Sequence, residues 1–357
     1  MKVTMFAGGL KATLTARTLP LAEALEDYGV ECKLIAPIRW PSVVKGKLGN
    51  VLSVALTHLP KKYIETLQKP PDFAIIGRVS TPQMYLLQKL LRSKGTKVIF
   101  DLDDALFLPS RVFGINFRSG SFCLEGIIKN ADFVTVNGNY LLEYVKVFNK
   151  NATVIPDPVD DKFFSSKSGK DCDKITIGWE GNPKAHYGNL VMLVKPLGML
   201  ARKYDIRFKL VSYLGDVKVK QMFGKLECVA EVDYGLNRWV SLDEYAKLLS
   251  DFDILVAPLI KTPWYEGKSS LRVGIGMAMG IPVVASPVGE QKYVIKHGIN
   301  GFLAKNEEEW YKYLKMLIED EKLRDSMGKS GRETAEKKLS SSACGKKLFD
   351  IMNRLLQ

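Results

Sequence analysis

A run of polar and cationic residues in the second half of the chain is the segment best suited to chemistry. Residues 262–290 read TPWYEGKSSLRVGIGMAMGIPVVASPVGE, and Lys268 and Arg272 lie there beside the start of an expected helix. A helix start offers unpaired backbone N–H groups and partial positive charge, and Ser269 and Ser270 are residues that often cap helices. Fixed cations and N–H donors together favour a diphosphate. A solvated helix end at the surface is the alternative interpretation.

Two carboxylates of this run are candidate ligands for sugar hydroxyls. Glu266 precedes Lys268 by two residues, and Glu290 follows Gly289 in the turn after an expected strand at 282–286. This turn would also present backbone N–H groups to a ligand. Glu290 could instead cap the helix that follows it, and both interpretations stay open.

The first strand-to-helix turn contains Gly8 and Gly9, which would let the backbone approach a phosphate or a sugar closely. A tight turn without a ligand is the alternative, since the turn does not read GxGxxG.

Residues 267–269 read GKS but do not form a P-loop, because Thr262 stands where that motif requires glycine. The glycines of residues 274–280 lie inside an expected helix, which argues against a dinucleotide fingerprint.

Three carboxylates, Asp101, Asp103 and Asp104, follow an expected strand in the first half of the chain. Carboxylates this close raise one another's pKa, which suits a general base or a site that binds the hydroxyl of an acceptor. Binding of a divalent cation and capping of the next turn are alternatives.

In the second half, Lys184 and His186 are expected in a loop after a strand at 175–179, where His186 could touch a phosphate.

The elements that must position these residues alternate between short β-rich runs and longer amphipathic runs. This alternation predicts an α/β fold with parallel sheets. We expect two Rossmann-like doubly wound domains facing a cleft: an acceptor domain at 1–160, a linker at 161–173, a donor domain at 174–330, and a C-terminal helix at 331–357 that crosses back to the first domain. The expected strands are 3–7, 31–36, 73–77, 97–101, 133–136, 153–155, 175–179, 208–213, 228–232, 253–258 and 282–286, and the main expected helices are 16–28, 82–93, 139–147, 189–203, 242–250 and 270–279.

Composition bounds the class of protein. The 357 residues suffice for two domains, and 46% hydrophobic and 25% charged residues are ordinary for a globular chain. The 5 cysteines form no CxxC pair, so we expect neither a disulfide framework nor a zinc site. The start of the chain lacks the features of a signal peptide, and the low-charge stretch 273–289 is too short and too rich in proline to span a membrane. We therefore expect a cytoplasmic protein.

The formal net charge of +13 favours anionic partners. Residues 39–69 carry a net charge of +5 and apolar residues at helical spacing, and residues 111–118 read RVFGINFR. Such segments suit an anionic membrane surface, which allows a peripheral location on the inner face of the membrane and a lipid-linked acceptor. A core-facing helix with solvated lysines is the alternative. No nucleic-acid-binding motif is visible, so nucleic acid is not expected as a partner.

Several motifs resemble those of GT-B glycosyltransferases of the family 4 type, the group 1 glycosyl transferases. The C-terminal ones are KSSLRVGIGMAMGIPVVASPVGE, which ends at residue 290, and HGINGFLA at 297–304. Supporting similarities are IGWEGNP at 177–183, VIFDLDDALF at 98–107, and VTVNGNYLLEYV and VIPDPVD between 134 and 160. The similarities occur in the family's order over most of the chain.

The resemblance implies a retaining, metal-independent transfer of a hexose from a UDP- or GDP-sugar to an acceptor hydroxyl on a glycan or a lipid-linked molecule, with no cofactor. It implies that Lys268 and Arg272 neutralise the departing diphosphate, and Lys184 is a weaker candidate for that role. The family's paired glutamates fall at Gly267 and Ile275. Ile275 cannot accept a hydrogen bond from a ribose, so Glu266 becomes the candidate for the sugar contact. A non-catalytic sugar-nucleotide-binding relative and a nucleotide-sugar epimerase of the same fold are the alternatives.

Overall fold

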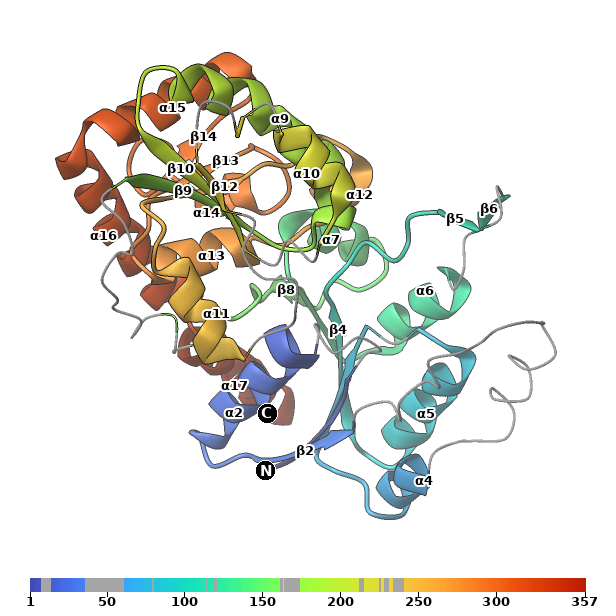
Figure 1. Ribbon diagram of the computed structural model, residues 1–357. Coiled ribbons are helices and arrows are strands. Elements are labelled where there is room, and N and C mark those ends of the chain that lie inside the picture. The colour runs from blue at the N-terminus through green and yellow to red at the C-terminus, as the bar shows by residue number, and fades with distance from the viewer. Residues whose placement is uncertain are drawn as a thin grey trace. The chain divides into compact units, whose positions relative to one another are not determined.

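The computed structural model describes residues 1–7, 14–35, 61–78, 80–112, 115–117, 121–160, 163, 174–211, 215–224, 226–227, 231–233 and 241–357. The chain divides into two compact units, each built on one parallel sheet (Figure 1). Unit 1 comprises Met1–Pro158 and Ser341–Gln357, and unit 2 comprises Val159–Ser340. Gly8, Gly9 and residues 36–60 lie outside the described part, as does the expected linker apart from Phe163.

The sheet of unit 1 has the strand order β2-β1-β3-β4-β7-β8, and all its described pairs are parallel. Connections run in opposite directions from β1 and β3, so the point where the strand order reverses lies between these two strands. The strands are β1 (Lys2–Phe6), β2 (Glu31–Ile35), β3 (Phe73–Gly77), β4 (Lys97–Leu102), β7 (Phe133–Val136) and β8 (Ala152–Val154).

Helices cover both faces of this sheet. On one face, α5 (Pro82–Ser93) begins at the N-cap Thr81, whose hydroxyl accepts a hydrogen bond from Met84 N, and it buries residues at helical spacing. The same face carries α4 (Lys61–Gln68), α6 (Ser121–Asn130) and α7 (Asn139–Lys146). The other face carries α2 (Leu19–Glu26), which follows the π-helical turn η1 (Leu14–Thr18), and α17 (Ser341–Leu356).

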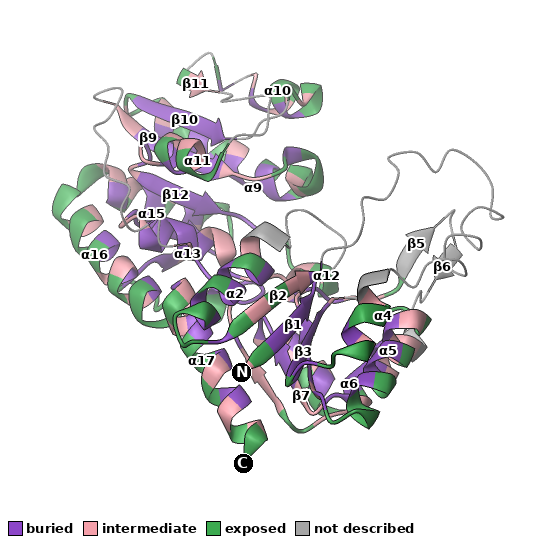
Figure 2. Cartoon of the chain, turned by 90° about the horizontal axis from the view of Figure 1, so that it is seen from below, coloured by how far each residue is buried: buried purple, intermediate pink, exposed green. Residues whose placement is uncertain are grey.

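The sheet of unit 2 has the order β11-β10-β9-β12-β13-β14, again with parallel pairs. This is the strand order of a Rossmann sheet, and its reversal point lies between β9 and β12. Strands β10 and β12 are buried throughout (Figure 2). The strands are β9 (Ile175–Glu180), β10 (Ile206–Val211), β11 (Glu231–Asp233), β12 (Ile254–Ala257), β13 (Val283–Ala285) and β14 (Phe302–Leu303).

Two apolar cores lie on the two faces of this second sheet. One core joins α9 (Pro183–Ala201), α10 (Val217–Phe223) and α15 (Glu307–Glu319) to the sheet, and Trp179 and Trp310 are its largest buried side chains. The other core joins α11 (Leu242–Leu249), α13 (Leu271–Ala278) and the end of α16 (Glu321–Lys338). The short helices α12 (Pro263–Glu266) and α14 (Gln291–Val294) follow β12 and β13.

The predicted fold class of two Rossmann-like α/β units is confirmed. Several local expectations are corrected. The segment 331–357 is not one helix, because α16 ends at Lys338 and α17 begins at Ser341. Residues 111–118, expected to form a basic, aromatic loop, contribute to two antiparallel strands, β5 (Ser110–Val112) and β6 (Ile115–Phe117). Within the described part of the chain, no helix combines the length and apolarity needed to cross a membrane.

Candidate functional site

The end of β9 and the first turn of α13 bring Glu180 and Arg272 together in unit 2. Arg272 Nε donates to the backbone oxygen of Glu180 at 2.8 Å and to its Oε1 at 3.1 Å. The hydroxyl of Tyr245, on α11, donates to Glu180 Oε2 at 2.5 Å. The guanidinium carbon also lies 5.1 Å from the ring centroid of Trp179, a cation–π distance. These contacts hold the guanidinium of Arg272 in one orientation at the reversal point of the sheet.

The remaining N–H groups of Arg272 are available to an anion. A guanidinium has five N–H donors, and only Nε has a hydrogen-bond partner among the described residues. The side chain is 14% exposed. Gly181, at φ +132°, lies directly beside it, and a Cβ there would stand 2.5 Å from Arg272 Nη2. The glycine therefore leaves room beside the guanidinium that any other residue would fill.

Lys268 belongs to a loop that packs tightly against the turn after β13. Its Nζ lies 4.6 Å from the ring centroid of Trp264, and its backbone oxygen accepts a hydrogen bond from Glu290 N at 3.0 Å. Gly289 has φ +63°, and a Cβ there would lie 2.7 Å from Tyr265 O and 2.8 Å from Lys268 O. Only glycine fits at this position, and the backbone that carries Lys268 is fixed by the contact.

The two glutamates of this region have different surroundings. Glu266 Oε2 accepts hydrogen bonds from Gly289 N at 3.3 Å and Lys292 Nζ at 2.8 Å, while Oε1 has no partner among the described residues. Glu290 is 6% exposed and occupies the N-cap position of α14 without a capping hydrogen bond from its side chain. The interpretation of Glu290 as a cap of its helix is therefore wrong.

Two serines that were expected to cap a helix, and Ile275, also belong to this segment. Ser270 is the N-cap residue of α13, but its side chain makes no capping hydrogen bond, and Ser269 Oγ accepts from Leu271 N only at 3.5 Å. The expected serine caps are thus weak or missing. Ile275, at the place of the family's second glutamate, is 6% exposed and packs in the apolar core between α13 and the sheet.

Lys184 and His186 lie in the first turns of α9 and not in a loop, so that expectation is wrong. The helix begins at Pro183 because Asn182 caps it: Asn182 Oδ1 accepts from Lys184 N at 3.1 Å. The side chain of Lys184 is exposed, whereas that of His186 is half-buried. Burial, and then the positive charges of Arg272 and Lys268, lower the pKa of His186 to about 3.

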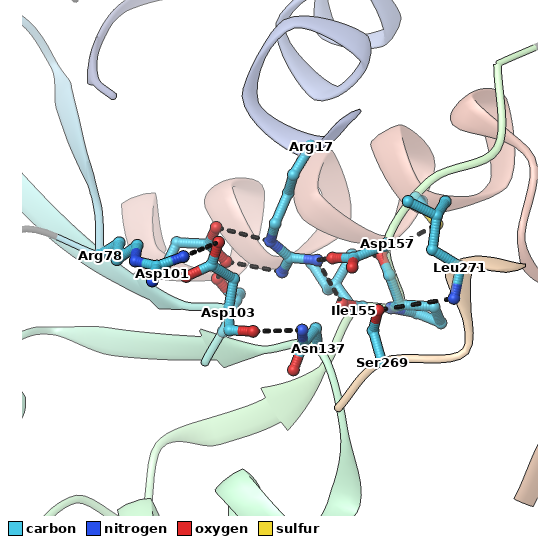
Figure 3. A network of polar contacts seen from close by, with 12 residues as sticks. Arg17, Arg78, Asp101, Asp103, Asn137, Ile155, Asp157, Ser269 and Leu271 are labelled. Carbon is cyan, nitrogen blue, oxygen red and sulfur yellow. Dashed lines mark hydrogen bonds and ion pairs between the residues drawn. The ribbon is translucent and has the colours of Figure 1, made fainter. Parts of the chain in front are cut away.

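In unit 1, Asp101 is committed to a buried ion pair (Figure 3). Arg17 donates from Nε to Asp101 Oδ2 and from Nη2 to Oδ1, both at 2.7 Å, and Thr135 Oγ1 donates to Oδ1 at 2.5 Å. Arg17 Nη1 donates to Asp157 Oδ1 at 2.8 Å and to the backbone oxygens of Ile155 and Pro156. Arg17 therefore ties η1 to the carboxyl ends of β4 and β8, and Asp101 serves this link.

Asp103 and Asp104 face Arg78, which follows β3 with a left-handed φ of +57°. Arg78 Nη1 lies 2.7 Å from Asp104 Oδ2 and 3.6 Å from Asp103 Oδ2. Asp103 Oδ1 is buried and has no partner among the described residues. Burial raises the pKa of Asp103 to about 6; Arg78 opposes this effect and nearby carboxylates add to it. Asp103 thus offers one unpaired oxygen to a hydrogen-bond donor.

Asn137, at the end of β7, adds a second acceptor beside Asp103. Its Nδ2 donates to the backbone oxygen of Asp103 at 2.5 Å, and its buried Oδ1 has no partner in the described part of the chain (Figure 3). The two oxygens without a partner there, Asp103 Oδ1 and Asn137 Oδ1, suit hydroxyl donors. In the same part of the chain, no group of three or more histidine, cysteine, aspartate or glutamate side chains is arranged to hold a metal ion.

Several residues of these sites were not predicted from the sequence. Glu180 and Asn137 each end or directly follow a buried strand, the same signal that identified Asp101. That signal was available from the pattern alone. Arg78 also follows a buried strand, but its left-handed backbone has no signature in the sequence. Tyr245 reaches Glu180 across 65 residues, so local spacing could not reveal the contact.

Gly289→Ala should lower stability and ligand affinity more than Gly298→Ala, a substitution at another glycine with a left-handed φ. Gly298 has φ +78° and no heavy atom near its Cβ position, so Gly298→Ala should cost about 1–2 kcal/mol of stability from strain alone. Gly289→Ala adds the overlap with two backbone oxygens and must displace the Lys268 loop. We expect a larger loss of stability and at least about tenfold weaker binding of a nucleoside diphosphate. Urea unfolding and calorimetry of both variants check this; equal losses would contradict it.

Known proteins resemble this chain in the sequence of unit 2 and in fold. The family model described as Glycosyl transferases group 1 matches residues 175–320, which lie within unit 2. No curated protein sequence matches the chain. The motif-based resemblance is thus confirmed for the unit that contains Lys268 and Arg272.

Solved structures share the fold over the full chain. A glycosyltransferase from Rickettsia africae has a TM-score of 0.70 at 16% identity, with 100% of this chain and 98% of that chain covered. HepE of Anabaena in complex with UDP has a TM-score of 0.68 at 14% identity, with 99% and 100% covered. A protein of Listeria monocytogenes that has a provisional assignment as a UDP-N-acetylglucosamine 2-epimerase has a TM-score of 0.64 at 12% identity, with 99% of this chain and 96% of that chain covered. The likeness establishes the GT-B fold.

Proposed function

We propose that this chain is a glycosyltransferase that transfers a hexose from a UDP- or GDP-sugar to an acceptor hydroxyl. The observation that carries the proposal is the guanidinium of Arg272. It is held by Glu180 and Trp179 at the reversal point of a Rossmann-order sheet, where ligands of such sheets bind, and its Nη groups have no partner among the described residues.

The cations of unit 2 supply the chemistry of bond cleavage. As the bond between the anomeric carbon and the phosphate oxygen breaks, the leaving diphosphate gains negative charge. Arg272 and Lys268 stabilise that charge more strongly in the transition state than in the ground state, and removing one such fixed donor costs about 2.7–4 kcal/mol. Glu266 Oε1 is the acceptor that we assign to a hydroxyl of the donor sugar.

Unit 1 handles the acceptor in this proposal. The unpaired Oδ1 of Asp103 accepts a hydrogen bond from the attacking hydroxyl, and Asp104 with Arg78 holds the adjoining backbone in place. The resemblance to retaining enzymes supports a product that keeps the anomeric configuration of the donor. Proton NMR of the first product formed reads that configuration directly.

Asp103→Asn should lower kcat for transfer by about 100- to 10,000-fold and leave donor affinity within about twofold, because the carboxylate acts on the acceptor. Asp350→Asn, which removes an exposed carboxylate of the same unit, should change neither quantity. Initial rates and calorimetry with the donor separate these effects. A parallel loss of donor affinity in Asp103→Asn would contradict the assignment.

An acceptor that is lipid-linked, with the enzyme bound to an anionic membrane surface, is part of the proposal. The net charge of +13 supports it, since such charge draws a protein to acidic lipids. Sedimentation with vesicles should require anionic lipid and decline with added salt. Binding that is the same to neutral vesicles would remove this part of the proposal.

A thermal-shift panel of UDP-, GDP-, ADP- and CMP-sugars tests the function, because a ligand that binds the folded state raises the melting temperature. The best donor is then incubated with and without acceptor glycans. Donor consumed only with an acceptor supports transfer.

The likeness to the Listeria structure favours epimerisation as the second candidate, which would convert the nucleotide sugar without an acceptor. Binding without any turnover would indicate a non-catalytic relative.

A further inference from the structure

A buried amide on α9 controls the hydrogen-bonding state of His186. Asn189 is fully buried, and its Oδ1 accepts the backbone N–H of Ile260 at 2.8 Å. This contact fixes the amide orientation, so that Nδ2 faces His186 Nδ1 at a distance of 2.8 Å. An amide nitrogen only donates, and Nδ1 must therefore accept. In the neutral ring the proton is then on Nε2.

The other neighbours of His186 keep the ring neutral and in place. Its ring centroid lies 5.9 Å from that of Trp179 and 6.0 Å from that of Tyr265. The Tyr265 hydroxyl donates to the backbone oxygen of Ala185 at 2.9 Å, which joins α12 to the start of α9. Arg272 and Lys268 are the nearby cations, and with burial they lower the pKa of the imidazole to about 3. The imidazole therefore carries no charge at neutral pH.

We propose that Asn189 is a positioning residue that holds His186 as an Nε2–H donor, and that this N–H binds a phosphate oxygen of the donor's diphosphate beside Arg272. Nε2 has no partner among the described residues. The inference rests on the proposed function, because it assigns the ligand of the same site. A neutral donor adds a directed hydrogen bond to the diphosphate without placing a third positive charge against Arg272 and Lys268.

The tautomer is tested first, in the free protein. Nitrogen-15 spectra of the imidazoles should show a proton-bearing Nε2 and a proton-free Nδ1 for His186. His297 is an internal reference, since its Nδ1 accepts from Leu303 N at 3.0 Å. In Asn189→Asp at about pH 8.5, where an imidazole of ordinary pKa is neutral, the new carboxylate should draw the proton to Nδ1. A proton on Nδ1 of His186 in the wild-type protein would overturn the proposal.

Binding is tested next, by calorimetry with UDP, GDP and inorganic pyrophosphate. His186→Phe should weaken the tightest of these ligands by about 10- to 100-fold, the range of a lost hydrogen bond to a charged group. His186→Gln, whose amide nitrogen can take the place of Nε2, should recover most of that loss. Asn189→Asp at about pH 8.5 should resemble His186→Phe in its affinity for this ligand.

The outcomes separate this inference from the proposed function. If the wild type binds a nucleoside diphosphate and His186→Phe binds it equally well, the inference is wrong and the proposed function stands. If His186→Gln loses as much affinity as His186→Phe, restoring an N–H donor at this position does not restore binding, which also overturns the inference. If the wild type binds none of the three ligands, both the inference and the proposed function fall.

Discussion

Arg272→Ala is expected to lower kcat/KM for transfer by about 100- to 1,000-fold, which corresponds to about 2.7–4 kcal/mol of transition-state stabilisation. The loss should be large because the Arg272 guanidinium is already oriented before the donor binds. Its Nε is held by the backbone oxygen and Oε1 of Glu180, and Trp179 supports the guanidinium plane. Only its Nη groups would meet the ligand, so the ligand does not have to order the side chain.

Two further variants sharpen this test. Arg272→Lys keeps a positive charge but lacks the forked guanidinium that can bond both Glu180 and a ligand. We therefore expect its kcat/KM to lie between those of the wild type and of Arg272→Ala. Arg332→Ala removes an arginine of the same unit that pairs with Glu336 on one helix face, and should leave kcat/KM unchanged. Steady-state kinetics measures all three. An Arg272→Ala enzyme with wild-type kcat/KM would exclude Arg272 from the site.

Arg17→Met should lower the free energy of unfolding of unit 1 by about 3–5 kcal/mol, because it leaves the buried Asp101 and the partly buried Asp157 without their cation. Arg17 is 2% exposed, and its bonds to Asp101 and Asp157 are 2.7 and 2.8 Å long. The urea dependence of hydrogen exchange in β3 and β4, the central strands of this unit, reports its local stability separately from that of unit 2.

Arg92→Met is the matched control for this prediction. Arg92 bonds both oxygens of Asp132 in the same unit, with the same residue types, but its side chain is 40% exposed. Solvent already screens this pair, so the variant should cost only about 0.2–1 kcal/mol. Equal losses for the two arginine variants would show that burial does not determine the strength of the Arg17 pairs.

The elements that the sequence predicts well are the buried parallel strands. The bounds of β3 and β7 agree with the expected 73–77 and 133–136, because such strands read as short apolar runs between turn residues. The start of α9 was missed, since its first turn, KAHYG, is mostly exposed and has no apolar periodicity. The signal that was present, asparagine followed by proline at 182 and 183, is a capping signal and not a periodic one.

The candidate sites show the same division between local and long-range information. Lys268 and Arg272 lie close in sequence, so their spacing predicts a shared helix start. Arg272 is oriented by Glu180 on β9, which in turn is bonded by Tyr245 on α11, and only the fold brings these residues together. Asp101 has the spacing of an acceptor-site residue, yet its oxygens are occupied by Arg17 and Thr135. A motif identifies residue types but not which atoms remain unpaired.

A crystal structure of the protein with UDP or GDP bound would locate the donor site. We expect a diphosphate at the carboxyl ends of β9 and β12, with phosphate oxygens at hydrogen-bond distance from the Nη groups of Arg272 and from Lys268 Nζ, and with Arg272 Nε still bonded to Glu180. A diphosphate bound elsewhere, with both cationic side chains directed into solvent, would contradict this expectation.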